Sequence, residues 1–227
     1  MPPGAEFHEH LATNWRENYS RLHFKNRLDV INSILDHVVQ EGQNWLDLGC
    51  GSGVITAELL KRGARVVALD GSPAMLNEAR RTLKKNGGLV SFREGDVQDL
   101  TWSDSSVFDG VLCSSVIEYV ENPDELIRES SRVLKTNGVL VLSLPPKYSF
   151  IRSSQKALRF LFKLIGKEQY AYLDVSNFEI SPAAVAGWLK SANIRLDQCF
   201  SYDPVLPKKL VSIFRPSLLI CEARKVD

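Results

Sequence analysis

The sequence predicts a single α/β domain in which a mostly parallel, seven-stranded sheet carries helices on both faces. Three observations support this prediction. Short apolar stretches of strand length alternate with longer stretches whose apolar residues recur at helical spacing. Glycine, asparagine and proline stand at the breaks between these stretches. The strand stretches are apolar almost throughout, which is typical of parallel strands that are covered on both faces.

Residues 1–40 are expected to form a helical cover over the sheet. Residues 1–26 are polar and aromatic, and an apolar stripe at helical spacing follows them. The stripe consists of Leu28, Ile31, Ile34, Leu35 and Val38. Gly42 is expected to end this helix.

The elements of the sheet follow in order along the chain. We expect the first five strands at residues 45–48, 65–69, 89–93, 107–113 and 139–144, and helices at residues 54–62, 73–84 and 123–134. Ser72 and Pro73 suit the N-cap and the first turn of the second of these helices. The segment Thr-Asn-Gly at residues 136–138 is expected to separate the last of them from the fifth strand.

Residues 147–180 interrupt the alternation after the fifth strand, and we expect this insertion to form a lid. The alternation resumes with a helix at residues 182–192 and strands at residues 195–202 and 218–223. One domain therefore spans residues 1–227, with the helical cover at one end and the insertion between the fifth and sixth strands.

Composition argues against several classes of protein. Lys and Arg total 28 and Asp and Glu total 27, so no bulk charge favours nucleic acid as a partner. The four cysteines form no CxxC pair and no Cys/His cluster with zinc-ligand spacing, so no metal site is predicted. We expect these cysteines to be reduced thiols of a cytoplasmic protein. The N-terminus does not read as a signal peptide, and no apolar run approaches the roughly 18 residues of a membrane span.

A glycine-rich turn follows the first strand, where residues 47–53 read Asp-Leu-Gly-Cys-Gly-Ser-Gly. Glycines allow a tight turn and let a ligand approach the backbone closely. Asp70, at the end of the second strand, can accept hydrogen bonds from both hydroxyls of a ribose. These features suit any nucleoside cofactor. A dinucleotide turn requires a third glycine at position 54, where this chain has Val54.

Several motifs in order resemble those of class I S-adenosylmethionine (SAM)-dependent methyltransferases. They are residues 46–53, residues 67–73, Gly-Asp-Val at residues 95–97, Phe-Asp-Gly-Val-Leu-Cys-Ser at residues 108–114, and residues 132–140. The resemblance implies a Rossmann-like fold with SAM as cofactor, in which Asp96 bonds the adenine amino group and Met75 packs on the adenine. The expected cofactor-binding residues are Arg27, Asp47, Gly49, Cys50, Gly51, Asp70, Gly71, Met75, Asp96, Val97, Cys113 and Ser114.

The acceptor is expected to be a small molecule. Methyltransferases of DNA adenine or of protein glutamine place Asn/Asp-Pro-Pro-Tyr after the fourth strand, whereas residues 113–116 here read Cys-Ser-Ser-Val. The similar string Leu-Pro-Pro-Lys-Tyr at residues 144–148 follows the fifth strand instead, and we interpret it as a strand stop. Nucleic acid is therefore not expected as a substrate.

After the fifth strand the chain reads Lys-Tyr-Ser-Phe at residues 147–150, then an aromatic-rich helix, Phe-Glu-Ile-Ser-Pro at residues 178–182 and Tyr-Asp-Pro at residues 202–204. This order is similar to that of the ubiquinone-biosynthesis O-methyltransferase group. The resemblance implies methylation of a phenolic oxygen and a contact of Arg27 with the SAM carboxylate. That group typically reads Glu-x-Leu/Ile-Glu-His-Val where residues 115–120 here read Ser-Val-Ile-Glu-Tyr-Val, so one acid and the histidine are missing. The candidates for a catalytic role are Glu118, Tyr119 and Tyr19, with His8, His10, His23, Tyr170, Tyr172 and Asp174 behind them.

The insertion contains a short basic amphipathic helix at residues 156–167. Apolar residues at helical spacing occupy one face, and Lys156, Arg159, Lys163 and Lys167 recur on another. We expect a lid helix that covers the site or packs on the domain. The alternative is peripheral contact with an anionic membrane surface.

The sequence thus favours SAM-dependent methyl transfer to a small, fairly apolar acceptor, at the oxygen of a phenolic, quinone-like or natural-product substrate. Three alternatives stay open at this point. They are an N-methyltransferase of a small amine or amino sugar, an NAD-dependent oxidoreductase, and a non-catalytic SAM-binding protein.

Overall fold

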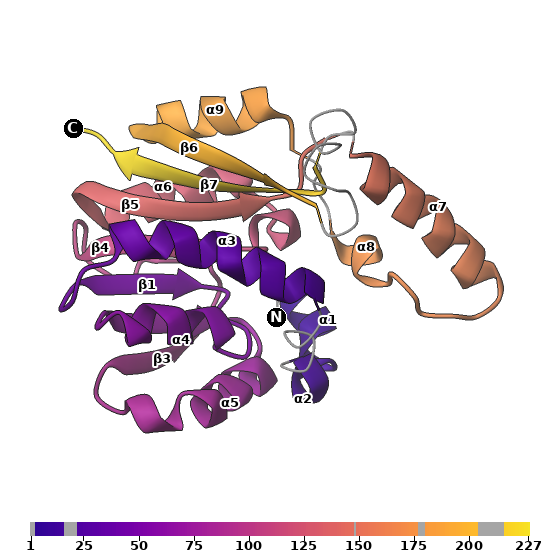
Figure 1. Cartoon of the computed structure of the whole chain (residues 1–227), viewed down its shortest axis with the longest axis horizontal. Helices are drawn as coiled ribbons and strands as arrows, with labels where there is room; N and C mark the ends of the chain where they lie inside the picture. Colours follow the sequence, from indigo (N-terminus) through magenta and orange to yellow (C-terminus); the bar gives the residue numbers. More distant parts are fainter. Residues whose placement is uncertain (1–2, 16–21, 148, 177–179, 204–215) are drawn as a thin grey trace.

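The sheet has seven strands in the order β3-β2-β1-β4-β5-β7-β6 (Figure 1). The structure is a computed structural model that describes residues 3–15, 22–147, 149–176, 180–203 and 216–227. The strands are β1 (Asn44–Leu48), β2 (Arg65–Asp70), β3 (Val90–Glu94), β4 (Phe108–Ser114), β5 (Leu134–Leu144), β6 (Ile194–Tyr202) and β7 (Leu218–Lys225). The first five strands pair in parallel, and β7 runs antiparallel to both β5 and β6. The predicted Rossmann-like, mostly parallel sheet is confirmed.

Helices connect these strands and cover both faces. The N-terminal helices are α1 (Pro3–Glu9), α2 (Ala12–Trp15) and α3 (Leu22–Val38). Those between and after the strands are α4 (Val54–Lys61), α5 (Pro73–Thr82), α6 (Pro123–Val133), α7 (Phe150–Leu164), α8 (Tyr172–Val175) and α9 (Pro182–Ser191), with short 3₁₀ turns η2 (Lys84–Asn86) and η3 (Ile117–Tyr119). The helical cover expected from residues 1–40 is therefore present as α1, α2 and α3.

Two apolar cores lie on opposite faces of the sheet. Alternate residues of one strand point to opposite faces, so Val111 packs against α6 and α9 while Leu112 packs on the side of α3 and α4. The predicted stripe of α3 supplies Ile31, Ile34, Leu35 and Val38 to the second core, all of them buried. Because both faces are covered, the edge formed by the carboxyl ends of the parallel strands is the natural place for a site.

Strand β5 begins earlier than the sequence predicts. It runs through the expected break at residues 136–138, and its register against β4 shifts between Phe108 and Gly110. Asn137 has a φ of 64°, a conformation that asparagine tolerates better than most residues. The Thr-Asn-Gly segment is therefore an irregularity within the strand, because Leu134 before it and Val139 after it both pair with β4.

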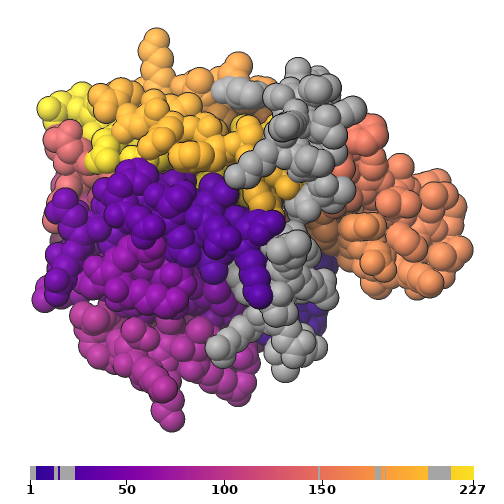
Figure 2. All heavy atoms as spheres, in the orientation of Figure 1, coloured from indigo at the N-terminus to yellow at the C-terminus, as the bar shows by residue number. Residues whose placement is uncertain are grey.

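The two ends of the insertion are joined to each other, whereas its helix α7 extends away from the sheet. Pro146 and Ile180 form an isolated parallel bridge, so the two ends of residues 147–180 lie side by side. The Pro-Pro string thus joins this bridge, in agreement with its interpretation as a strand stop. Helix α7 stands away from the sheet in Figure 1, and the same protrusion is visible in Figure 2. Its outer side chains, Phe160, Leu161, Leu164 and Ile165, are exposed and do not pack on the domain.

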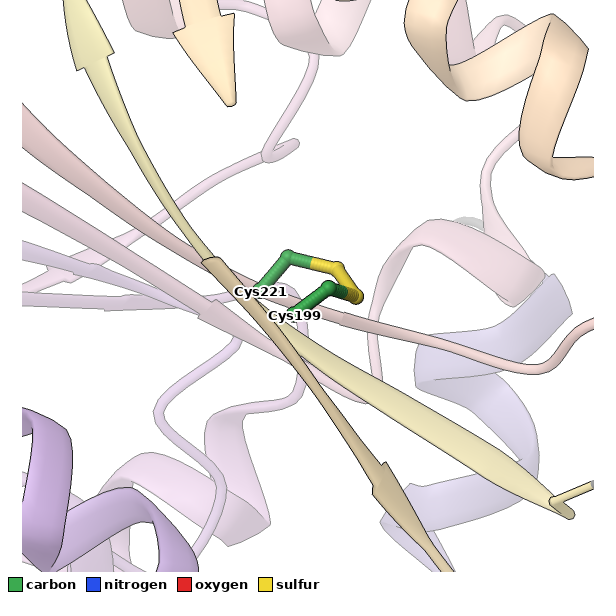
Figure 3. Close-up of a disulfide and its surroundings, with 2 residues drawn as sticks. All are labelled: Cys199 and Cys221. Atoms are coloured by element: carbon green, nitrogen blue, oxygen red, sulfur yellow. A yellow bond between two sulfur atoms is a disulfide. The ribbon is translucent and has the colours of Figure 1, made fainter. Parts of the chain in front are cut away.

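The expectation of four reduced cysteines is wrong for two of them. Cys199 and Cys221 are direct cross-strand partners in the β6–β7 pair and form a disulfide (Figure 3). Cys50 and Cys113 are free, buried thiols. The sequence could not reveal this disulfide. The two cysteines are brought together only by the antiparallel register of β6 and β7, and that register cannot be derived from the spacing of the cysteines in the sequence. Among the described residues, no helix is both long and apolar enough to cross a membrane.

Candidate functional site

A cavity of about 460 Å³ opens at the carboxyl ends of β1, β2 and β4. This volume lies within the range of roughly 300–1,000 Å³ that is usual for small-molecule and cofactor sites. Its walls come from four parts of the chain, namely the glycine turn after β1, the end of β2, the loop after β3 and the segment after β4. The N-terminal arm, residues 3–15, closes it from outside together with the start of α3.

The glycine turn is held against the end of β2 by its backbone. The N–H groups of Gly49 and Cys50 both donate to the carbonyl oxygen of Leu69, at 2.8 and 3.0 Å. Gly49 has a φ of +68°, and a Cβ there would lie 2.3 Å from Cγ2 of Val116. Position 49 therefore requires glycine both for its backbone conformation and for the approach of the segment after β4.

Asp70 braces the turn from the end of β2. One carboxylate oxygen accepts from the N–H of Gly51 at 2.8 Å, and the other accepts from the N–H of Ser72 at 2.9 Å. Burial raises the pKa of Asp70, while these two hydrogen bonds oppose the rise. Each oxygen keeps a further lone pair, and the carboxylate lines the cavity. Asp70 can thus hold the turn and still accept from two ribose hydroxyls.

Asp47 also combines two roles. It is buried at the end of β1, accepts from the hydroxyl of Thr56 at 2.6 Å, and lines the cavity. Burial raises the pKa of Asp47 to about 7, with a further rise from the charge of Asp70 and an opposing effect of the Thr56 bond. A cationic ligand in the cavity would favour the ionised form of Asp47.

The far end of the cavity is formed by the loop after β3 and the start of α5. Asp96 accepts from the N–H of Gln98 at 2.9 Å, so one of its oxygens stabilises the loop. Asp96, Val97 and the buried Met75 all line the cavity, as does Gly71. At this end, Asp96 offers a hydrogen-bond acceptor for an amino group, and Met75 offers an apolar surface. The two together suit an adenine ring.

Arg27 reaches the opposite end of the cavity from α3. Its Nη2 donates to the hydroxyl of Ser114 at 2.6 Å, and its buried Nε has no hydrogen-bond partner among the described residues. An unpartnered guanidinium N–H beside a cavity fits a carboxylate ligand. Ser114 lines the cavity, whereas Cys113, which the sequence also placed there, points into the core and is outside the lining.

The N-terminal arm lies across the cavity mouth and is tied to α5. Glu9 accepts from the hydroxyl of Ser72 and from the N–H of Ala74, the latter at 3.1 Å. Gly4, Ala5, His8 and Trp15 of the arm line the cavity. The role of Glu9 was not predicted from the sequence, because no local pattern reveals a contact over so long a sequence separation.

The three predicted catalytic residues differ in position. Tyr119 lines the cavity, and burial raises the pKa of its hydroxyl well above the usual range. Glu118 is buried behind the lining, and its Oε2 has no hydrogen-bond partner among the described residues. Burial raises the pKa of Glu118, and the positive charges of Arg152 and Arg27 oppose the rise. Tyr19 lies outside the described residues, so its role stays a prediction.

The remaining candidate bases are scattered. His8 lines the cavity, and His10 is exposed. Asp174 pairs with Arg159, and the hydroxyl of Tyr172 donates to Gln155. The side chain of His23 lies outside the described part of the chain. In the described ranges, no three His, Cys, Asp or Glu side chains come together as a metal site.

Fold and site together define the class of protein. A parallel α/β sheet places a glycine turn, a strand-end carboxylate and an adenine-sized end in one cavity, which is the arrangement of a nucleoside-cofactor enzyme. Comparison with known proteins then decides which cofactor it takes.

A methyltransferase-domain sequence profile matches residues 46–142. Two curated relatives are named ubiquinone biosynthesis O-methyltransferases. One, from Xanthomonas oryzae, is 30% identical over 219 residues, covering 90% of this chain and 89% of the relative. The other, from Hahella chejuensis, is 30% identical over 211 residues, covering 87% and 84%. The chain belongs to the SAM-dependent methyltransferase family, and SAM is its cofactor.

Solved structures agree on the fold. The magnesium protoporphyrin IX methyltransferase of Synechocystis, solved with bound S-adenosylhomocysteine (SAH), has a TM-score of 0.69 at 20% identity, covering 93% of this chain and 88% of that one. A SAM-dependent methyltransferase from Mesorhizobium loti has a TM-score of 0.67 at 19% identity, covering 87% and 96%. The choice between SAM and NAD, which the sequence left open, is settled in favour of SAM.

Proposed function

We propose that this enzyme transfers the methyl group of SAM to an oxygen of a small, fairly apolar acceptor, of the phenolic or quinone-like type. One observation carries the proposal. The cavity that is lined by the acidic cofactor-binding residues is also lined by three aromatic side chains, Trp15, Phe24 and Tyr119. Aromatic walls favour a flat, apolar acceptor. The names of the curated relatives point in the same direction.

We further propose roles for the residues around the cofactor. Arg27 binds the cofactor carboxylate, Asp70 the ribose hydroxyls, and Asp96 the adenine amino group. Met75 packs against the adenine. When bound, SAM supplies an activated methyl group, so the protein has mainly to align the acceptor and exclude water. Both roles are assigned to the arm and the segment after β4, because both segments line the cavity.

The test is an assay of radiolabelled methyl transfer from SAM. Catechol and substituted catechols serve as phenolic acceptors, and benzylamine and an amino sugar serve as amine acceptors. We expect labelled methyl on catechol oxygen, and no comparable product from the amines. Preferential labelling of the amines would overturn the proposal in favour of an N-methyltransferase.

The N-methyltransferase alternative rests on one observation. Glu121 lines the same cavity as the aromatic residues, and a site with both an acidic side chain and aromatic rings can hold an amine. Replacement of Glu121 by Gln distinguishes the two functions. It should leave catechol methylation within about twofold of the wild type, whereas loss of activity toward amines would support the alternative. SAH binding without turnover of either acceptor class would instead indicate a non-catalytic SAM-binding protein.

A second part of the proposal is peripheral contact of α7 with an anionic membrane. Phe160, Leu161 and Leu164 are 65%, 56% and 70% exposed on α7, which stands away from the sheet (Figure 1). Lys163 and Lys167 are exposed nearby. An amphipathic helix of this kind can bury its apolar face at a lipid surface.

The basic stripe read from the sequence needs one correction. Arg159 is only 7% exposed and pairs with Asp174 and Glu168, at 2.6 and 3.0 Å. Its pKa is raised by these partners, the Asp174 hydrogen bond first. Arg159 therefore connects α7 to α8 and is not available to lipid headgroups. The sequence did not show this, because helical spacing alone does not reveal which face of the helix contacts the rest of the insertion.

Vesicle flotation tests the membrane contact. We expect binding to vesicles that contain phosphatidylglycerol and weaker binding to pure phosphatidylcholine. The double variant Lys163→Glu/Lys167→Glu should lose most of the binding, as should Phe160→Ser/Leu164→Ser. Lys190→Glu, an exposed lysine of α9, is the matched control. Equal flotation of all variants would overturn the contact. The cytoplasmic location belongs to the same proposal and is tested by cell fractionation.

A further inference from the structure

The N-terminal arm places one imidazole in the cavity. The ring of His8 packs edge-on against three aromatic rings, with centroid distances of 5.2 Å to Phe7, 5.0 Å to Trp15 and 5.1 Å to Tyr119. Its interplanar angles to all three are between 85° and 89°. His8 is thus enclosed by apolar surface while still lining the cavity.

Contacts at both ends of α1 fix the position of His8. At one end Gly4 lies against η3, where a Cβ on Gly4 would lie only 2.6 Å from Cβ of Tyr119. At the other end Glu9 accepts from Ser72 and from the N–H of Ala74. A negative charge at the N-terminus of α5 is also favourable to the helix dipole. The imidazole is therefore held by packing and by hydrogen bonds on both sides.

The contacts of His8 define its tautomer. Nδ1 lies 2.7 Å from the carbonyl oxygen of Gly4, and a carbonyl can only accept. Nδ1 therefore carries the hydrogen, which leaves the lone pair of a neutral ring on Nε2. Nε2 makes no hydrogen bond within the described part of the chain. A neutral imidazole with a free Nε2 lone pair is a proton acceptor.

The charges around His8 are compatible with a neutral ring near pH 7. Burial lowers the pKa of His8, while the Gly4 carbonyl and the negative charge of Asp70 on β2 raise it. The ring of Tyr119 on η3 contacts His8, and its hydroxyl is neutral, since burial raises the pKa of that hydroxyl. Two other candidate bases are less suited to the role. Glu118 lies outside the cavity lining, and Asp174 pairs with Arg159.

We propose that His8 is the general base that accepts the proton of the acceptor hydroxyl during methyl transfer. This inference rests on the O-methylation proposed above. The acceptor oxygen forms a bond to the methyl carbon, the carbon–sulfur bond breaks, and its electron pair stays on sulfur. The hydroxyl proton passes to Nε2 of His8 and from there to water. Proton removal in the transition state makes the oxygen a better nucleophile.

Two acceptors of different acidity test the role kinetically. In His8→Asn, the side-chain amide can still donate to the Gly4 carbonyl, but it is not a base. We expect kcat with catechol to fall about 100-fold, which is the low end for the loss of a general base. The loss should be much smaller with 4-nitrocatechol, which is already ionised near neutral pH. SAH affinity should stay within about twofold. The exposed His10→Gln is the matched control, with unchanged kcat for both acceptors.

A purely structural role of His8 would lower kcat for both phenols equally. That result would overturn the role of His8 as general base and leave the proposed O-methylation intact. If the wild type methylates no phenol, the proposed function itself fails, so the two failures are distinguishable. Nuclear magnetic resonance of ¹⁵N-labelled histidine in the SAH complex gives a second readout. We expect a hydrogen on Nδ1, none on Nε2, and a shift of the Nε2 signal on addition of catechol. A hydrogen on Nε2, or no response to catechol, would contradict the role of His8.

Discussion

The two halves of the cavity are built in different ways. On the cofactor side, the turn after β1 and the end of the adjacent parallel strand β2 are joined by short-range hydrogen bonds. The Gly49 N–H donates to the carbonyl of Leu69, and Asp70 accepts from the Gly51 N–H. On the acceptor side, His8 comes from the arm and Tyr119 from the turn after β4, more than a hundred positions away. Cofactor binding is thus encoded in short, contiguous motifs, whereas the acceptor surface is assembled from distant segments.

This difference implies that the two halves should respond differently to substitution. On the cofactor side, each residue holds another in place, so one change should disturb the whole turn. On the acceptor side, packing and a few long-range hydrogen bonds position each residue, and changes there should alter turnover more than SAM affinity.

The largest effect is expected from adding a methyl group at the glycine turn. Gly49 and Gly166 have nearly the same φ, +68° and +69°, but only Gly49 has a close neighbour, Cγ2 of Val116 at 2.3 Å from a built Cβ. Gly49→Ala should lower SAH affinity by about 100-fold or more, measured by calorimetry, because the turn must move away from β4. Gly166→Ala, in the insertion, carries the same backbone strain without the clash.

Gly166→Ala should bind SAH like the wild type, at a cost of about 1 kcal/mol in the free energy of unfolding. Equal losses of affinity in both variants would show that backbone strain, rather than the close approach to β4, governs the turn.

The second largest effect is expected at Asp70. In Asp70→Asn the amide must turn its NH₂ group toward either the Gly51 or the Ser72 N–H, since both carboxylate oxygens are acceptors in the wild type. We expect SAH affinity to fall about 10- to 100-fold, because one backbone donor is left unpaired and a charged acceptor is lost. An unchanged affinity would remove Asp70 from the site. Asp197→Asn, on the exposed face of β6, is the control.

The prediction for Asp47 concerns pH. Its pKa in the folded protein, about 7, lies above the usual value of 3.8 for an aspartate, so its contribution to stability is greatest below the unfolded pKa and is lost as pH rises toward 7. Asp47→Asn should therefore raise the Tm of the free protein, and the gain should grow from pH 5 to pH 8. The measurement is a thermal melt at each pH.

The same residue should make cofactor binding depend on pH. Cationic SAM favours the carboxylate form of Asp47, so wild-type affinity should rise about tenfold between pH 6 and pH 8. Asp47→Asn should show a flat profile over that range. A parallel rise in wild type and variant would assign the titration to another group.

The smallest effect is expected away from both halves. His37 of α3 lies 2.8 Å from the buried carboxylate of Glu222 on β7, and this hydrogen bond is the main cause that raises the pKa of His37. A raised histidine pKa stabilises the fold below the unfolded value of 6.5, and the stabilisation disappears as pH rises through the folded value.

His37→Gln should therefore lower Tm slightly near pH 6 and leave it unchanged near pH 9. The effect is small because His37 is about half exposed and its ion pair is screened by water. His10→Gln should give no pH-dependent difference. If the loss of Tm in His37→Gln grew with pH, a stabilising contribution from protonated His37 would be contradicted.

The fold and the cofactor side were predictable from sequence because their signals are local. Strand, glycine turn and helix follow one another directly, so residues 45–62 reveal both the element order and the site. Errors such as the early start of β5 arise where pairing with neighbouring strands outweighs a turn signal.

The acceptor side was less predictable because its contacts join distant segments. Nothing near Glu9 indicates that it binds Ser72 and the backbone of α5, and the periodicity of α7 could not show that Arg159 faces inward to Asp174. The Cys199–Cys221 pair depends on the register of two antiparallel strands in the same way. Glu118 and Tyr119 were both candidates from the sequence, and only the turn of η3 shows that Tyr119 lines the cavity while Glu118 lies behind the lining.

The most direct measurement is the fate of a ¹³C-labelled methyl group of SAM in the presence of catechol. We expect one equivalent of SAH for each O-methylated catechol in the wild type. His8→Asn should lose most of the product at unchanged SAH affinity, and Gly49→Ala should lose both binding and product. Methyl transfer to nitrogen only, or SAM binding with no transfer to any phenol, would contradict the proposed O-methylation.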